Sequence, residues 1–222
     1  MKQNLKKKMN KDKFLAAISY EHEVYTHIKG NPKRIFLLLH GYLLDGSYLL
    51  RTLRETIPNN SLILAPNGPF PVPVKKKDGF VPKYAWYFFD PLKKNYYINF
   101  DPASIFLKDV VEKYNPKKLP VTIIGYSQGG YLAPKVAELI LEVDSVVGLA
   151  CTFRNERFEV RAEVQYHQIN SKADLIVDYP QSQEEFTKLK ERGNQGQFIS
   201  LKEAGHKIDE CYLKELSTIL VS

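Results

Sequence analysis

The chain is organised around the stretch Val121-Thr122-Ile123-Ile124-Gly125-Tyr126-Ser127-Gln128-Gly129-Gly130. Pro120 ends the preceding segment, and the four β-branched residues that follow it are typical of a short buried strand. From Tyr131 to Leu141, apolar residues recur at helical spacing. Between the predicted strand and the predicted helix lies a G-x-S-x-G motif. This context is typical of a nucleophile elbow, a tight turn that holds a serine hydroxyl above the end of a strand.

The two glycines of the motif have a physical reason. Side chains there would crowd the turn, and the helix that follows directs its N–H groups and its dipole at Ser127, where negative charge would develop. G-x-S-x-G also occurs as a plain glycine-rich turn, so the motif alone leaves a structural role open. A catalytic role for Ser127 also requires a base and an acid elsewhere in the chain, and their presence or absence distinguishes the two interpretations.

A second apolar run, from Arg34 to Leu39, predicts a buried parallel strand that leads into His40-Gly41-Tyr42. Such a loop can supply one backbone N–H to an oxyanion hole, and the residue after the serine can supply the other. We therefore expect the N–H groups of Tyr42 and Gln128 to form that hole. For His40 we expect a structural role in holding the loop.

Predicted strands and helices alternate along most of the chain. The strands are expected at 22–28, 34–39, 61–65, 121–124, 145–150, 164–170 and 197–201, and the helices at 47–57, 101–114, 131–141, 181–192 and 209–220. This alternation predicts an α/β fold, with a mostly parallel sheet and helices on both faces. Sites in such sheets lie at the carboxyl ends of the strands. Residues 14–222 are expected to form a single domain.

Two candidate partners of Ser127 follow later predicted strands. Asp174 comes in the loop after the strand 164–170, and His206 comes after the last strand. A histidine can take the proton of a serine hydroxyl, and an aspartate can orient that histidine and stabilise its charged form. The order Ser127, Asp174, His206 fits such a catalytic triad. Asp178 competes with Asp174, which is favoured because it lies nearer the strand end.

Residues 66–102 differ in composition from the rest of the chain. They hold seven of the thirteen prolines and ten of the twenty-seven aromatic residues. We expect an irregular insertion beside the serine that lines an apolar pocket, with Trp86, Tyr87, Phe88 and Phe89 as its wall. Leu43, next to the expected oxyanion loop, is a further candidate. The alternative is that these rings only pack the insertion onto the body.

The overall composition excludes several classes of protein. The chain has 222 residues, 44% hydrophobic and 26% charged, as in ordinary globular domains. Its net charge is +7, of which +5 falls in residues 1–13, so we expect a flexible basic N-terminus and no nucleic-acid partner. No apolar run approaches the ~20 residues of a membrane span, and no secretory signal is evident. Cys151 and Cys211 lack metal-ligand spacing, so a cytoplasmic chain with free thiols and no metal is expected.

The sequence resembles the small α/β-hydrolases of the phospholipase/carboxylesterase family, which includes the acyl-protein thioesterases. The resemblance runs from about residue 34 to the end. It is carried by Leu39-His40-Gly41-Tyr42 with Asp45, Ala65-Pro66-Asn67-Gly68-Pro69, Trp86-Tyr87-Phe88-Phe89-Asp90, Gly125-Tyr126-Ser127-Gln128-Gly129-Gly130 and Ala204-Gly205-His206-Lys207-Ile208. It implies an α/β-hydrolase fold and a cofactor-free esterase or thioesterase.

The chain departs from that family before and after the expected aspartate. Asn170-Ser171 stands where the family usually has His-Gly, and Leu175-Ile176-Val177 stands where it usually has two valines and a proline. The loop after Tyr42 reads Leu43-Leu44-Asp45, where the family has Gly-Asp. Substrate choice does not carry over, because the family is diverse in its acyl and alcohol groups.

The first functional hypothesis is a serine carboxylester hydrolase that cleaves small or medium acyl esters through an acyl-enzyme. Two alternatives stay open: an acyl thioesterase or lysophospholipase, and a non-catalytic α/β-hydrolase that binds a ligand. The expected partner is a small-molecule or lipid ester. Stable membrane insertion is not expected, and a homodimer is left open.

Overall fold

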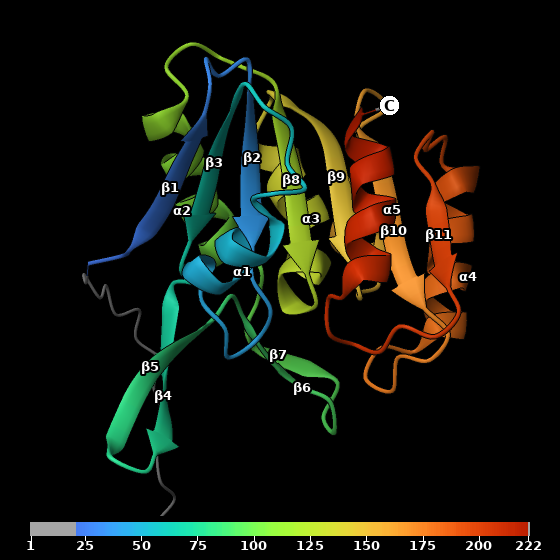
Figure 1. Ribbon diagram of the computed structural model, residues 1–222. Helices are drawn as coiled ribbons and strands as arrows, with labels where there is room; N and C mark the ends of the chain where they lie inside the picture. The colour runs from blue at the N-terminus through green and yellow to red at the C-terminus, as the bar shows by residue number, and fades with distance from the viewer. Residues whose placement is uncertain (1–20, 222) are drawn as a thin grey trace, which may run out of the picture.

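The computed structural model describes residues 21–221, so the basic segment predicted for residues 1–13 lies outside the described residues. Its centre is one seven-stranded sheet in which only the first strand runs antiparallel to its neighbour (Figure 1). In spatial order the strands are β1 (Val24–Lys29), β3 (Ser61–Pro66), β2 (Arg34–Leu39), β8 (Val121–Tyr126), β9 (Val143–Leu149), β10 (Gln165–Ser171) and β11 (Phe198–Leu201).

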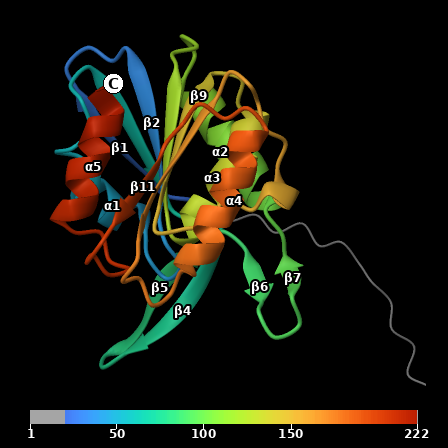
Figure 2. The same ribbon diagram turned by 90° about the vertical axis from the view of Figure 1, so that its right-hand side faces the viewer.

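Helices cover both faces of the sheet, as Figure 2 shows. The helices α1 (Gly46–Leu53) and α5 (Glu210–Val221) pack on one face, and α2 (Asp101–Tyr114), α3 (Gln128–Leu139) and α4 (Tyr179–Glu191) pack on the other. The predicted α/β-hydrolase architecture is therefore confirmed. No helix within residues 21–221 has the length and apolar character needed to cross a membrane.

The apolar run of β2 serves both layers of the core. Ile35, Leu37 and Leu39 point toward α2 and α3, whereas Phe36 and Leu38 point toward α1 and α5. Successive side chains of a strand point to opposite faces, so a strand buried on both sides has to be apolar throughout. This is why the run contains no polar position between Ile35 and Leu39.

The segment between β3 and α2 is more regular than we expected. It forms two short antiparallel ribbons, β4 (Phe70–Lys76) with β5 (Gly79–Ala85), and β6 (Phe88–Asp90) with β7 (Asn95–Ile98). Proline is tolerated here because each strand of a two-stranded ribbon keeps one free edge. Both ribbons project beyond the carboxyl ends of the parallel strands, where sites in such sheets lie (Figure 1).

Close packing fixes the start of α3 against the sheet. A Cβ atom added at Gly129 would lie 2.1 Å from the carbonyl oxygen of Leu39, and one added at Gly125 would lie 2.4 Å from that of Gly129. Such distances are well inside van der Waals contact. Any side chain at these glycines would push α3 away from β2 and β8.

We therefore expect Gly129→Ala to lower the free energy of unfolding by roughly 3 kcal/mol, because backbone atoms on β2 cannot yield to the new methyl group. Helix propensity alone would favour alanine by about 1 kcal/mol. The matched control is Gly205→Ala, because a Cβ atom there meets nothing within 4 Å. Urea unfolding of both variants measures the difference, and equal stabilities would contradict the steric argument.

Candidate active site

Ser127 occupies the turn between β8 and α3 in a strained backbone conformation. Its φ is +49° and its ψ is −118°, a region that residues with side chains rarely adopt. The Ser127 carbonyl accepts hydrogen bonds from the N–H groups of Gly130 and Tyr131, at 2.8 and 3.1 Å. The hydroxyl is thereby held at the carboxyl end of β8.

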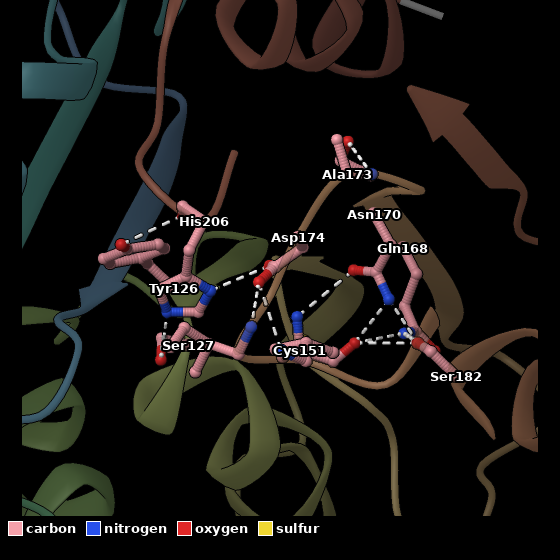
Figure 3. Close-up of polar contacts among 12 residues, drawn as sticks. Tyr126, Ser127, Cys151, Gln168, Asn170, Ala173, Asp174, Ser182 and His206 are labelled. Carbon is pink, nitrogen blue, oxygen red and sulfur yellow. Dashed lines mark hydrogen bonds and ion pairs between the residues drawn. The ribbon is translucent and has the colours of Figure 1, made fainter. Parts of the chain in front are cut away.

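The structure brings Ser127, His206 and Asp174 together (Figure 3). The Nε2 atom of His206 lies 3.0 Å from Ser127 Oγ, and its Nδ1 atom lies 2.8 Å from Asp174 Oδ2. A carboxylate only accepts hydrogen bonds, so the proton belongs on Nδ1 and Nε2 is free to accept from the serine hydroxyl. The three side chains come from the ends of β8, β10 and β11.

Burial and hydrogen bonds fix the position of the Asp174 carboxylate. Its side chain is 1% exposed, and Oδ1 accepts hydrogen bonds from the N–H groups of Ile176 and Val177 at 2.8 and 3.1 Å. The competing residue, Asp178, has a different task. Its carboxylate caps the N-terminus of α4 by accepting from the N–H of Gln181 at 2.9 Å.

Tyr126 positions the loop that carries His206. Its hydroxyl donates to the carbonyl oxygen of His206 at 3.1 Å, and the two rings lie 5.5 Å apart. Burial, together with the charge of Asp174, raises the pKa of Tyr126 to about 12. The tyrosine therefore stays neutral and keeps its O–H donor.

The two residues expected to form the oxyanion hole, Tyr42 and Gln128, line the same cavity as Ser127. The N–H groups of Tyr42 and Gln128 donate to no acceptor within residues 21–221. The loop after Tyr42 is fixed by strand-like pairing with β5: Leu43 N–H donates to Tyr84 O at 3.0 Å, and Tyr84 N–H donates to Leu44 O at 3.1 Å. The N–H groups of Tyr42 and Gln128 therefore remain available as donors, and their role as an oxyanion hole stays a prediction.

His40 is buried and holds this loop, in line with the role expected for it. Its Nδ1 atom contacts the carbonyl oxygen of Gly41 at 2.7 Å, and Nε2 accepts the N–H of Gly68 at 2.9 Å. Burial lowers the pKa of His40 to about 4, so the ring is neutral near pH 7. Its carbonyl oxygen accepts the indole N–H of Trp86 at 2.7 Å.

A cavity of about 500 Å³ opens beside the serine. It is lined mainly by aromatic and apolar side chains, namely Tyr42, Tyr87, Phe88, Phe89, Pro91, Tyr131 and Ile176, together with Ser127 and Gln128. The side-chain amide of Gln128 fixes one wall, since it accepts the N–H of Trp86 and donates to the carbonyl oxygen of Tyr87, at 2.9 and 3.0 Å.

Two residues expected in the pocket wall do not line this cavity. Trp86 is fully buried in the core, where its indole N–H is used by His40. Leu43 has a positive φ of 58°, and its backbone is turned to pair with β5. Sequence reasoning missed Tyr131, which is recognisable as the residue one helical turn after the serine, and it missed Ile176.

A buried amide network stands where the related family usually has His-Gly. The side chain of Asn170 donates to Cys151 O at 2.7 Å and accepts from Cys151 N–H at 3.1 Å, and Gln168 and Ser182 donate to the same carbonyl oxygen, each at 2.9 Å (Figure 3). The network fixes the end of β10, four residues before Asp174, to the loop that follows β9.

Cys151, in the loop after β9, is not an activated nucleophile. Burial raises the pKa of the Cys151 thiol, which keeps it protonated and unreactive. Within residues 21–221, no group of three or more His, Cys, Asp or Glu side chains is arranged to hold a metal ion.

Comparisons with known proteins identify the family and the fold of this chain. A family model described as serine hydrolase (FSH1) matches residues 29–161. No curated protein sequence gives a significant match. Among solved structures, acyl-protein thioesterase 2 of Zea mays is similar with a TM-score of 0.71 and 22% identity over 90% of this chain and 97% of its own.

Two further structures share the fold. The carboxylesterase of Bacillus cereus has a TM-score of 0.67 and 16% identity, over 90% of this chain and 93% of its own. YahD, solved with malic acid, has a TM-score of 0.70 and 20% identity, over 90% of this chain and 98% of its own. At these identities the likeness concerns the fold.

The two aspartates provide a matched test of the site. We expect Asp174→Asn to lower kcat by about 10⁴-fold, because an amide no longer fixes the tautomer of His206 or stabilises its charged form. Asp178→Asn should stay near wild type, since asparagine caps a helix as well as aspartate does. Ester hydrolysis rates of the two variants measure this, and the reverse result would exchange their roles.

Asp45 lies at the end of the expected oxyanion loop. Its lowered pKa predicts that the stability of the protein decreases at acidic pH. Burial alone would raise its pKa, but Lys83 at 2.8 Å, the Ser47 hydroxyl and the Tyr48 N–H outweigh it and lower the pKa to about 2. A carboxyl whose pKa falls on folding stabilises the protein above its ordinary pKa, and this contribution is lost as the pH falls from about 4 to 2.

We therefore expect the Tm difference between wild type and Asp45→Asn to be largest above pH 5 and to shrink toward pH 2. Asparagine keeps the helix cap, so the difference reports the ion pair with Lys83. Thermal melts across this pH range measure it. A difference that stays constant with pH would rule out the ionised Asp45 as its source.

Proposed function

The chain belongs to the FSH1 family of serine hydrolases, and we propose that it cleaves small or medium acyl esters as a carboxylester hydrolase, through an acyl-enzyme. The observation that carries the proposal is the chain of contacts from Ser127 to His206 to Asp174, at 3.0 and 2.8 Å. These are hydrogen-bond distances between groups in the roles of nucleophile, base and orienting acid.

In the first half of the reaction, His206 Nε2 takes the proton of Ser127 while Oγ attacks the carbonyl carbon of the ester. Asp174 stabilises the imidazolium that forms, and the N–H groups of Tyr42 and Gln128 bind the oxyanion. Loss of one such donor costs on the order of 3 kcal/mol in other enzymes. The intermediate collapses as His206 returns the proton to the leaving oxygen, which releases the alcohol and leaves Ser127 acylated.

In the second half, a water molecule replaces the alcohol. His206 takes a proton from the water as its oxygen attacks the acyl carbon, and then gives that proton to Ser127 Oγ. The carboxylic acid departs and the free enzyme returns. The same base serves both halves, and no cofactor is called for by this scheme.

A thioester or lysophospholipid substrate is the second candidate. Ile176 in the cavity wall is 73% exposed, and Leu92 and Leu175, the chain neighbours of the lining residues Pro91 and Ile176, are 94% and 95% exposed. A long acyl chain could cover these side chains, as lipid substrates do. A thiol leaving group would pass through the same steps, with His206 protonating sulfur.

A non-catalytic binding protein of this fold would be expected to lack one of the three residues or their contacts. Here all three are in reach of one another, which is why catalysis is proposed first. A cytoplasmic location and a homodimer stay predictions.

We expect Ser127→Ala to abolish both turnover and covalent labelling by a fluorophosphonate probe, while the protein stays folded. Peptide mapping of the wild type should place the label on Ser127. Ser217→Ala, on the surface of α5, is the matched control and should behave as wild type.

A series of p-nitrophenyl esters of increasing chain length then separates the two candidates. An optimum at short or medium acyl chains supports the carboxylester hydrolase, and one at long chains supports a lipid or thioester substrate. If folded Ser127→Ala hydrolysed esters at a rate close to that of the wild type, the assignment of Ser127 as the nucleophile would be wrong.

A further inference from the structure

The cavity beside Ser127 lies on the acyl side of the reaction. His206 has to protonate the leaving group, so that group must lie against Nε2 of His206. The cavity is lined by Ser127 and by both residues of the proposed oxyanion hole, but His206 is absent from its lining. On the proposed mechanism, the cavity therefore holds the acyl part of the substrate.

This acyl cavity continues into a second one of about 650 Å³. The two share five lining residues, Tyr87, Phe89, Pro91, Tyr131 and Ile176. The second cavity changes in character, because it adds the basic side chains of Lys94, Arg154 and Arg157 and only one acidic side chain, Glu156. An apolar passage thus leads from the serine to a positively charged end.

Arg154 lies beside Tyr131, which lines both cavities. It follows β9 in the loop at the carboxyl edge of the sheet, and its guanidinium lies 6.0 Å from the centre of the Tyr131 ring. Tyr131 is one helical turn, about 5.4 Å, beyond Ser127. A group several bonds from the scissile carbonyl can therefore reach Arg154 by passing along the Tyr131 ring.

The charge of Arg154 is not neutralised within residues 21–221. The residue is half-buried, yet in this part of the chain its guanidinium forms no ion pair and no hydrogen bond; only its backbone carbonyl is used, by the N–H of Arg157 at 2.8 Å. Arg157 differs, since it contacts Glu156 at 3.7 Å and stacks 4.7 Å from the Tyr96 ring. A half-buried guanidinium with five unused donors is suited to bind a carboxylate by two parallel hydrogen bonds.

We propose that this chain acts on acyl groups that end in an anion: esters or thioesters of a dicarboxylic acid, whose distal carboxylate binds Arg154 while the apolar chain lies along Tyr131 and Tyr87. The inference rests on the proposed hydrolase activity and specifies its substrate. Charge-assisted hydrogen bonds in a partly desolvated site are strong enough to set such a preference.

The test compares two matched p-nitrophenyl ester series. One carries a distal carboxylate, as the monoesters of adipic, suberic and sebacic acids, and the other carries the neutral distal carboxamide of the same length. For wild type, kcat/KM should favour the carboxylate by at least about tenfold at the best chain length, mainly through KM. Arg154→Gln should bring the ratio of the two series close to one, and Arg154→Lys should restore part of it.

Lys117→Gln is the matched control. It also removes one positive charge, but from an exposed loop that precedes β8, at the opposite edge of the sheet, and it should keep the wild-type ratio. Wild-type turnover that depends on Ser127 but shows no preference would overturn the anion site and leave the hydrolase standing. An equal loss on both series in Arg154→Gln would also overturn it, by showing that Arg154 only supports Tyr131.

A binding measurement separates this inference from the proposed function. Calorimetric titration of Ser127→Ala with the suberate monoester and its carboxamide reads affinity without turnover. Tighter binding of the carboxylate, lost when Arg154→Gln is added, supports the anion site even if no ester is hydrolysed. Equal affinities for the two compounds would overturn it.

Discussion

The site depends on a steric constraint: the start of α3 lies so close to β2 and β8 that no Cβ atom fits at Gly125 or Gly129. This contact forces the chain through the turn at Ser127 with a φ of +49°. The strain raises the energy of one residue, and the surrounding core holds it in place. Within residues 21–221 the same turn leaves the Gln128 N–H without an acceptor and places Tyr131 at the cavity wall, so the proposed nucleophile, one proposed oxyanion donor and the pocket follow from one packing contact.

Much of the fold could be predicted from the sequence, because its strands and helices carry strong periodic patterns. The elbow, Asp174 and His206 could be singled out because they follow predicted strands, and the carboxyl ends of parallel strands share one edge. The pocket wall could not be predicted as well. Trp86 is aromatic and near the site, but its indole N–H needed a buried acceptor and found it in His40, which drew the ring into the core. Leu43 turned away because its backbone pairs with β5.

The regular secondary structure of residues 66–102 could not be predicted from the sequence either. Prolines argue against a central strand, and we expected irregular chain from them, but a two-stranded ribbon offers free edges on which a missing N–H costs nothing. Arg154 was not recognised because its neighbours in sequence carry no motif. Its place beside Tyr131 depends on the loop that follows β9, which no sequence pattern describes.

The ribbons between β3 and α2 affect how the sequence of such a protein can change during evolution. The proposed nucleophile, base and acid all follow strands of the sheet, whereas much of the proposed acyl wall lies on an excursion of the chain whose two ends are anchored by β3 and α2. Changes of length in such an excursion cost little entropy. Apart from the positions that contact the body, among them Gly68, Lys83, Tyr84 and Trp86, the excursion can therefore diversify independently of the sheet. Substitutions in the excursion can therefore change which substrates are selected without changing the residues proposed to carry out the reaction.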